Sequence, residues 1–323
     1  MSTSSTLSAP SHAGPSASSN QLASTTLEQL WFGEDDPDDA RDRARASFAA
    51  QIALVRGLRP FPVAAGRLIE LLGDSDFDDR LVVRTLESDP ALTARTLTLA
   101  NSALFRRSTP CTSIADALRR LGSRNVREIA IGVAAMSMFA DAGGVGVAIR
   151  DHSVGVAAIL RTLSDAVVPA ESSTLFLTGL LHDVGKLLLV QTSELDYDSP
   201  RAIGMEPHLF EREALGFDHA VLGCCALRMW RIPEAIADTV AWHHQPSRAL
   251  QMGGLIGLRV TLLRIADRIE ALLASDQELD ADAFLALARD GDCSYAELSA
   301  ADLRGLWPAL RDARVEALGN GFR

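Results

Sequence analysis

The apolar residues of this chain recur with the period of an α-helix over most of its length. Leu92, Thr96 and Leu99, for example, follow i, i+4, i+7 spacing, which places them on one face of a helix. Strand-forming residues never cluster into the alternating apolar and polar runs of a half-buried strand. The sequence therefore predicts an all-α fold in two packed helical subdomains.

Residues that start and stop helices give approximate bounds for these elements. Asp89 is placed to cap a helix with Pro90 in its first turn, and Asp218 to cap a helix that begins near His219. Gly122 is a natural end for the helix before it. In the second half we expect five helices, over residues 148–168, 171–191, 206–230, 233–244 and 253–274.

Changes in composition divide the chain into four parts. Residues 1–43 are Ser/Thr-rich and then acidic, so burial cannot offset the entropy of ordering them and we expect a disordered arm. Gly143, Gly144 and Gly146 interrupt the helical pattern and mark a boundary. The other parts are an N-terminal helical subdomain over 44–142, a second helical subdomain over 143–275, and a helical C-terminal extension over 276–323.

Charge and composition narrow the classes of function. The 323-residue chain has a formal net charge of -11, which makes binding to a phosphate backbone unfavourable, so we expect no nucleic-acid partner. The N-terminus has no cationic stretch followed by an apolar run, as a signal peptide would have. The most apolar segment, Ile129–Ala140, is shorter than the roughly 20 residues that cross a bilayer. We expect a cytoplasmic protein that does not enter the membrane.

Most residues that could bind a metal lie in the second subdomain. Five candidate histidines and two aspartates fall on or at the ends of expected helices there, and successive candidates are about one helix plus a turn apart. A helical bundle can point such residues into one interior site. Imidazole and carboxylate together suit Fe, Mn, Zn or Ni. The candidate ligands, for one ion or for two bridged by Asp183, are His152, His182, Asp183, His219, His243, His244 and Asp267.

Each of these residues also has an ordinary structural interpretation. A single histidine on an apolar face is commonly a core residue with satisfied hydrogen bonds, and Asp183 alone could pair with Lys186 or a backbone group. The whole set favours a metal, because several buried polar groups need partners at once, although a hydrogen-bonded remnant of such a site meets the same need. Asp183 and Lys186 are the catalytic candidates, with neither role assured. Lys186 shares a helix face with His182 and could meet a phosphate oxygen.

The segment Leu180-Leu-His-Asp-Val-Gly-Lys-Leu187 resembles the signature of the HD superfamily of metal-dependent phosphohydrolases. The order of His152, His182-Asp183 and Asp267 is similar to the H…HD…D ligand set of that superfamily. The resemblance implies an HD-like helical bundle that binds a divalent metal.

Three further histidines are His219 and the pair His243-His244. They resemble the additional ligands of the HD-GYP branch, the cyclic di-GMP phosphodiesterases. The Gly-Tyr-Pro motif of that branch is missing, and Gln245-Pro246-Ser247 follows the histidine pair in place of His-Glu-Arg. The match to this branch is therefore looser.

Five further segments occur in order along the chain: Ser88–Arg95, Leu97–Phe105, Ile114–Gly122, Gly216–Gly223 and Met229–Glu234. They resemble a different subfamily, the HDOD domain, and the whole match covers about residues 48–272. HDOD domains are bacterial signalling and regulatory modules linked to stress responses and motility. The resemblance implies regulation through contacts with other signalling proteins, with a homo-oligomer as a further option. The alternative is a metal-dependent phosphohydrolase acting on a nucleotide or another phosphoester.

Asn101 and Ser102 are the most family-typical polar pair of the first half. They could contact a partner or the second subdomain. The preferred interpretation is that they end a helix, because Asn and Ser favour helix termini over helix interiors.

Overall fold

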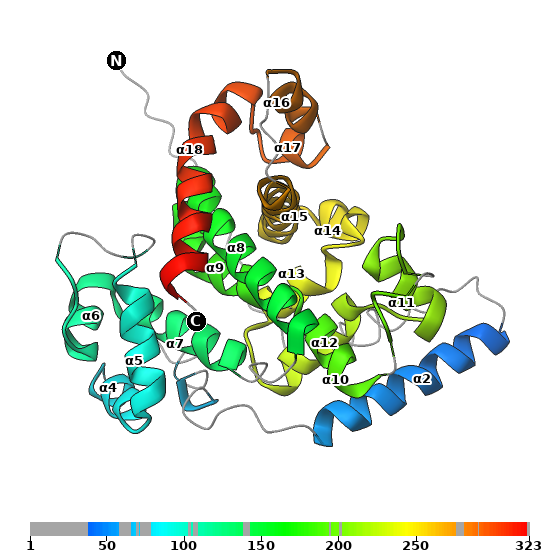
Figure 1. Ribbon diagram of the computed structural model, residues 1–323, viewed down its shortest axis with the longest axis horizontal. Coiled ribbons are helices and arrows are strands. Elements are labelled where there is room, and N and C mark those ends of the chain that lie inside the picture. Colours follow the sequence, from blue (N-terminus) through cyan, green and yellow to red (C-terminus); the bar gives the residue numbers. More distant parts are fainter. Residues whose placement is uncertain are drawn as a thin grey trace, which may run out of the picture.

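The computed structural model describes residues 38–57, 66–68, 71, 79–102, 105, 109–137, 143–193, 195–199, 202–275, 281–289 and 291–321. Within these ranges every regular element is a helix, so the fold is all-α, as the periodicity predicts (Figure 1). The expected disordered arm lies outside the described residues up to position 37, and the first described helix already begins at Asp38. This start precedes the expected one at Ala44, because acidic residues are favourable in the first turn of a helix.

The helices fall into three consecutive groups along the chain. The N-terminal group comprises α2 (Asp38–Gly57), α4 (Asp79–Glu87), α5 (Pro90–Ala100), α6 (Ile114–Leu121) and α7 (Ser123–Ser137). The central group comprises α8 (Gly143–Val167), the 3₁₀ turn η1 (Pro169–Glu171), α9 (Ser172–Leu181), α10 (Val184–Thr192), α11 (Pro207–Leu215), α12 (His219–Met229), α13 (Glu234–Trp242), α14 (Pro246–Met252) and α15 (Gly254–Ala274). The C-terminal group comprises α16 (Ala281–Ala288), α17 (Gly291–Tyr295), α18 (Ala300–Glu316) and the π-helical turn η2 (Ala317–Gly321).

The long helix α8 organises the central group. It packs against α9 and α15 of that group and against α18 of the C-terminal group (Figure 1). Helices α4 to α7 pack against one another, whereas α2 crosses over to α10, α11 and α12. The ring of Phe48 on α2 meets that of Phe217 edge to face, with 5.1 Å between the centroids.

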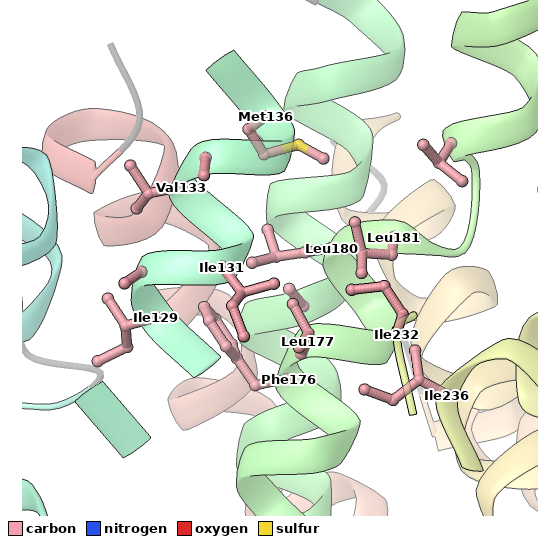
Figure 2. Packing of buried hydrophobic residues seen from close by; sticks show 14 of the residues in the cluster. Ile129, Ile131, Val133, Met136, Phe176, Leu177, Leu180, Leu181, Ile232 and Ile236 are labelled. Carbon is pink, nitrogen blue, oxygen red and sulfur yellow. The ribbon is translucent and has the colours of Figure 1, made fainter. Parts of the chain in front are cut away.

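Apolar packing between α7 and α9 joins the N-terminal and central groups. Figure 2 shows isoleucine, valine and methionine side chains of α7 against phenylalanine and leucine side chains of α9, with Ile232 just before α13 and Ile236 inside it. Each fully buried side chain of this size contributes roughly 1.5–3 kcal/mol relative to exposure. The labelled members of this core are Ile129, Ile131, Val133, Met136, Phe176, Leu177, Leu180, Leu181, Ile232 and Ile236.

The residues expected to bound helices do so. Asp89 caps α5 by accepting a hydrogen bond of 3.0 Å from the backbone N–H of Leu92, and Asp218 caps α12 in the same way. Gly122 ends α6 with a φ of 83°, in the left-handed region that favours glycine. Gly144 and Gly146 differ from expectation, because both lie inside α8.

Two of the expected helices are each split into two. The 206–230 helix breaks after Gly216, whose φ of 85° ends α11. The 171–191 helix breaks at His182 and Asp183, between α9 and α10. The segment Pro169–Thr192 is long and apolar enough to cross a membrane, but 83% of its apolar 18-residue window is buried inside this fold, as in the core helix of a globular domain. The break is important for the candidate site, because both residues in it, His182 and Asp183, are candidate metal ligands.

Candidate metal centre

His182 and Asp183 occupy the turn between α9 and α10, and each is only 1% exposed. The turn is held against α12 by Gly185, where a Cβ atom would overlap the carbonyl oxygen of His219 and lie 2.9 Å from the backbone nitrogen of Gly223. Only glycine allows α10 to approach α12 so closely. This approach sets the distance between Asp183 and the first residue of α12.

One group of potential ligands comes from α8, the turn after α9, and α15. The ligand atoms of His152, His182 and Asp267 all lie within 4.8 Å of one another. Nε2 of His152 lies 3.1 Å from Oδ1 of Asp267. Three ligands from separate helices thus converge on one small volume.

A second group comes from α12 and the end of α13. The ligand atoms of His219, His243 and His244 also lie within 4.8 Å of one another. Nε2 of His219 is 2.9 Å from Nε2 of His244. Two ligands bound at about 2.0–2.1 Å to one ion stand roughly 3 Å apart, so this spacing suits a shared cation.

Asp183 lies between the two groups. Its Oδ1 atom is 3.1 Å from Nε2 of His219 and 3.5 Å from Nε2 of His182. Its Oδ2 atom is 3.8 Å from Nε2 of His152 and accepts a hydrogen bond of 2.7 Å from Lys186. One carboxylate therefore faces both groups, the position of a bridging ligand. The structure brings together all seven residues that the sequence proposes as ligands.

Four of the histidines are anchored through Nδ1. Nδ1 of His182 donates to the carbonyl of Gly179 over 2.8 Å, and Nδ1 of His243 donates to the carbonyl of Val240 over 2.6 Å. A carbonyl can only accept, so these rings carry the proton on Nδ1 and leave the Nε2 lone pair free. The other two Nδ1 atoms lie 2.7 Å from carboxylates, His152 from Glu270 and His219 from Glu211. Such outer partners are typical of metal-binding histidines, whose orientation and basicity they fix.

Two histidines of the cluster pair with carboxylates strongly enough to favour a positive charge. Burial disfavours the imidazolium of His152, but hydrogen bonds to Asp267 and Glu270 outweigh this penalty and raise its pKa to about 10. Burial likewise opposes a charge on His219, yet Glu211 helps to raise its pKa to about 9. Each proton occupies a place that a cation could take.

The other members of the cluster favour the forms that bind a metal. Burial lowers the pKa of His182, His243 and His244, so these imidazoles are neutral. Burial alone would raise the pKa of Asp183, but the neighbouring His182 and Lys186 hold it well below its usual range. Neutral imidazole and ionised carboxylate are the ligand forms that divalent cations require.

Two polar atoms in the cluster provide a test of whether a metal fits. Oδ1 of Asp183 and Nε2 of His243 are buried and form no hydrogen bond among the described residues. Buried polar atoms without partners are rare in folded proteins and need a compensating ligand, water or ion. Both atoms face the other candidate ligands, so a divalent cation fits the residues present.

A cavity of about 350 Å³ opens onto one side of the cluster. His152, Asp183 and Lys186 form its polar wall, and Val145 and Ile149 of α8 lie on its apolar wall. Its size suits a small ligand. The Lys186 ammonium, whose pKa the adjacent Asp183 raises despite burial, provides a positive charge for an anionic ligand.

Sequence reasoning missed the residues that hold the ligands in place. Glu270 could have been found, because it lies one helical turn after Asp267 on the same face of α15. Glu211, which also accepts a hydrogen bond from Tyr197, carries no comparable sequence signal. The same is true of His208, whose ring stacks on His244 with 4.1 Å between centroids.

Asn101 and Ser102 are not part of this cluster and lie at the end of α5. The Asn101 side chain exchanges two hydrogen bonds with the backbone of Cys111, and the hydroxyl of Ser102 donates to the carbonyl of Leu99. These bonds close the loop between α5 and α6. The expected contact of the pair with a partner or with the second subdomain stays a prediction.

Comparison with known proteins extends over most of the chain. A family model described as the HDOD domain matches residues 58–246. A structure from Shewanella amazonensis SB2B, described as that of a candidate phosphohydrolase, is 26% identical, with a TM-score of 0.66 over 84% of this chain and 97% of that one. An HDOD domain protein from Geobacter sulfurreducens is 21% identical, with a TM-score of 0.62 over 84% of this chain and 98% of that one.

A curated relative gives a more limited match. An uncharacterized protein of Treponema pallidum (strain Nichols) is 23% identical over 175 residues, which are 50% of this chain and 33% of that protein. This chain therefore spans about a third of that relative's length.

Proposed function

The chain belongs to the HDOD domain family, and we propose that this HD-type signalling protein holds one or two divalent ions and regulates other signalling proteins through direct contacts. One observation carries the proposal. Two groups of ligand atoms face a shared Asp183, and four of the histidines that surround it have Nδ1 fixed by a carbonyl or carboxylate. A site that served packing alone would have no need to leave Nε2 of His243 buried without a hydrogen bond among the described residues.

The residues have separate roles in such a site. His152, His182 and Asp267 would hold one ion, and His219, His243 and His244 the other, with Asp183 between them. A divalent ion supplies Lewis acidity at a site of this kind. Lys186 neutralises Asp183 and presents its ammonium to the cavity, where it can bind an anionic group.

Metal analysis of the purified protein tests the proposal. We expect one or two equivalents of Fe, Mn, Zn or Ni in the wild type and a loss of more than roughly 100-fold in affinity in His182→Ala. The loss should exceed the 10–100-fold effect of removing an outer partner, because a ligand itself is removed. The measurement is elemental analysis after dialysis against buffered metal.

His12→Ala provides the matched control, because His12 lies in the Ser/Thr-rich arm of the sequence and is not among the seven candidate ligands. The same substitution there should leave the metal content unchanged. Equal metal content in His182→Ala and His12→Ala would contradict the proposal, as would a metal-free wild type under all four metals.

A second candidate function is hydrolysis of a phosphoester. The cavity lined by His152, Asp183 and Lys186 favours it, and the Shewanella amazonensis structure carries a corresponding description. In that case Lys186 would bind a phosphoryl oxygen, and Asp183 would orient the reacting groups.

Turnover assays separate this function from regulation alone. Protein loaded with Fe or Mn is incubated with cyclic di-GMP, pppGpp and a generic phosphodiester. If the chain is a hydrolase, Lys186→Met should lower kcat by roughly 10²–10³-fold, as removal of a charge-stabilising donor does. No turnover above that of the double variant His182→Ala, Asp183→Ala would exclude hydrolysis of these substrates.

A further inference from the structure

Glu270 on α15 connects the candidate metal centre to the C-terminal helix. Its Oε2 atom accepts a hydrogen bond of 2.7 Å from Nδ1 of His152, and its Oε1 atom accepts one of 2.9 Å from Nε of Arg314. Glu270 is only 3% exposed, so both oxygens depend on protein partners. A chain of hydrogen bonds therefore runs from α18 through α15 to a candidate ligand on α8.

The backbone of α8 is shaped to admit Glu270. Gly155 lies one turn after His152, and a Cβ atom at this position would be 2.8 Å from Cγ of Glu270. Any larger residue at position 155 would displace the carboxylate that orients His152. The side chain of Glu270 is thus enclosed by Gly155, His152 and Arg314.

Arg314 is held firmly enough to act on Glu270. Helix α18 packs along α8, and its residues Leu303 and Leu310 are fully buried against side chains of α8 and α15. The Arg314 side chain itself is 19% exposed. The turn η2 that follows α18 packs against both α8 and α5. The C-terminal group therefore touches the N-terminal group and the metal centre together.

The energetics favour a donor at the position of Arg314. Without it, Oε1 of the buried Glu270 carboxylate would lose its hydrogen bond, and the carboxylate would turn toward water or another donor, because a buried acceptor without a partner costs free energy. Such a rotation would remove the acceptor from Nδ1 of His152. The ring would then lose the bond that directs its Nε2 atom toward Asp267, 3.1 Å away.

We propose that Arg314 is a positioning residue of the metal centre, which sets the orientation of the His152 ligand through Glu270 and so couples the C-terminal helix to metal binding. The proposal rests on the proposed metal-holding function of the cluster. It names a residue that lies outside the matched family region, residues 58–246. A partner or modification that moved α18 would change metal affinity through this chain of contacts.

The test compares Arg314→Gln and Arg314→Met with Arg314→Lys in the full-length protein. The methionine variant keeps an apolar stem of similar length and serves where the glutamine variant does not fold. Affinity for Mn²⁺ and the absorption spectrum of the Co²⁺-loaded protein report on the ligand set. We expect roughly 10-fold weaker Mn²⁺ binding and an altered Co²⁺ spectrum in the first two variants, with recovery in Arg314→Lys.

Arg311→Gln is the matched control. Arg311 lies on the same helix, is 61% exposed and pairs only loosely with Asp312, at 3.6 Å. The Arg311→Gln substitution should change neither the Mn²⁺ affinity nor the Co²⁺ spectrum. Thermal melting of all four variants by circular dichroism identifies any that do not fold.

A second readout does not depend on metal. In metal-free protein labelled with ¹⁵N-histidine, the Nδ1–H proton of His152 should give a downfield signal that exchanges slowly, assigned by its loss in His152→Ala. We expect this signal to broaden or vanish in Arg314→Gln and Arg314→Met and to persist in Arg314→Lys. An unchanged signal in both would overturn the inference, as would unchanged Mn²⁺ affinity in a wild type that binds Mn²⁺. A wild type that binds no metal would contradict the proposed function. The imidazole signal would still decide whether Arg314 positions His152.

Discussion

Gly185→Ala is expected to lower the free energy of unfolding by about 3 kcal/mol or more. The added Cβ would overlap the carbonyl oxygen of His219 and lie 2.7 Å from its carbonyl carbon. Both are backbone atoms, which cannot rotate away as a side chain can, so α10 must move from α12. Urea unfolding followed by circular dichroism measures the change as a lower midpoint at an unchanged slope.

The same substitution at Gly305 is its control. Gly305 lies inside α18, where a Cβ atom would meet nothing within 4 Å. Alanine there should raise stability by up to about 1 kcal/mol, because glycine is the poorer helix former. If the urea midpoint of Gly185→Ala were no lower than that of Gly305→Ala, the close approach of α10 to α12 would not exist in solution.

Asp183→Ala is expected to abolish binding at both groups of ligands and to cost about 3 kcal/mol of stability in metal-free buffer. The loss of metal follows from the position of Asp183 between the groups. The loss of stability follows from Lys186, whose ammonium would keep a largely buried position without its partner 2.7 Å away. Elemental analysis measures the first effect, and urea unfolding in the presence of a chelator measures the second.

A double variant separates the two effects of Asp183. Asp183→Ala with Lys186→Met removes both charges, and replacing a buried ion pair with apolar groups is often close to neutral. We expect stability to return to within about 1 kcal/mol of the wild type while metal binding stays absent. A double variant as unstable as Asp183→Ala alone would show that Lys186 is not the source of the cost.

Local features of the sequence predicted much of the fold. The period of apolar residues predicts α5 and the all-α class, and the capping chemistry of Asp89 and Asp218 predicts where helices begin. The break at His182 and Asp183 escaped prediction. Neither residue is a helix breaker. The turn is fixed by the packing of Gly185 on α12, and the sequence near the turn does not specify this long-range contact.

The candidate ligands were also predictable, but the partner that each of them would take was not. His and Asp at regular helical intervals are visible in a sequence, because their chemistry is unusual for an apolar core. The partner of His152 lies 118 residues away, on another helix. The partners of His182 and His243 are backbone carbonyls, which every residue possesses. Pairings of this kind depend on how helices pack, and no single segment specifies them.

The candidate ligand atoms come from α8, α12, α15 and the chain around the ends of α9 and α13, and with the proposed metal this distribution would link the lifetime of the protein to the supply of that metal. An unfolded chain holds none of these atoms together, so an ion would bind the folded state almost exclusively. At a free metal concentration 100 times the dissociation constant, one site of this kind adds about 2.7 kcal/mol to the free energy of unfolding. Starvation for that metal would remove this increment, expose more of the unfolded chain to proteases and lower the amount of the regulator in the cell.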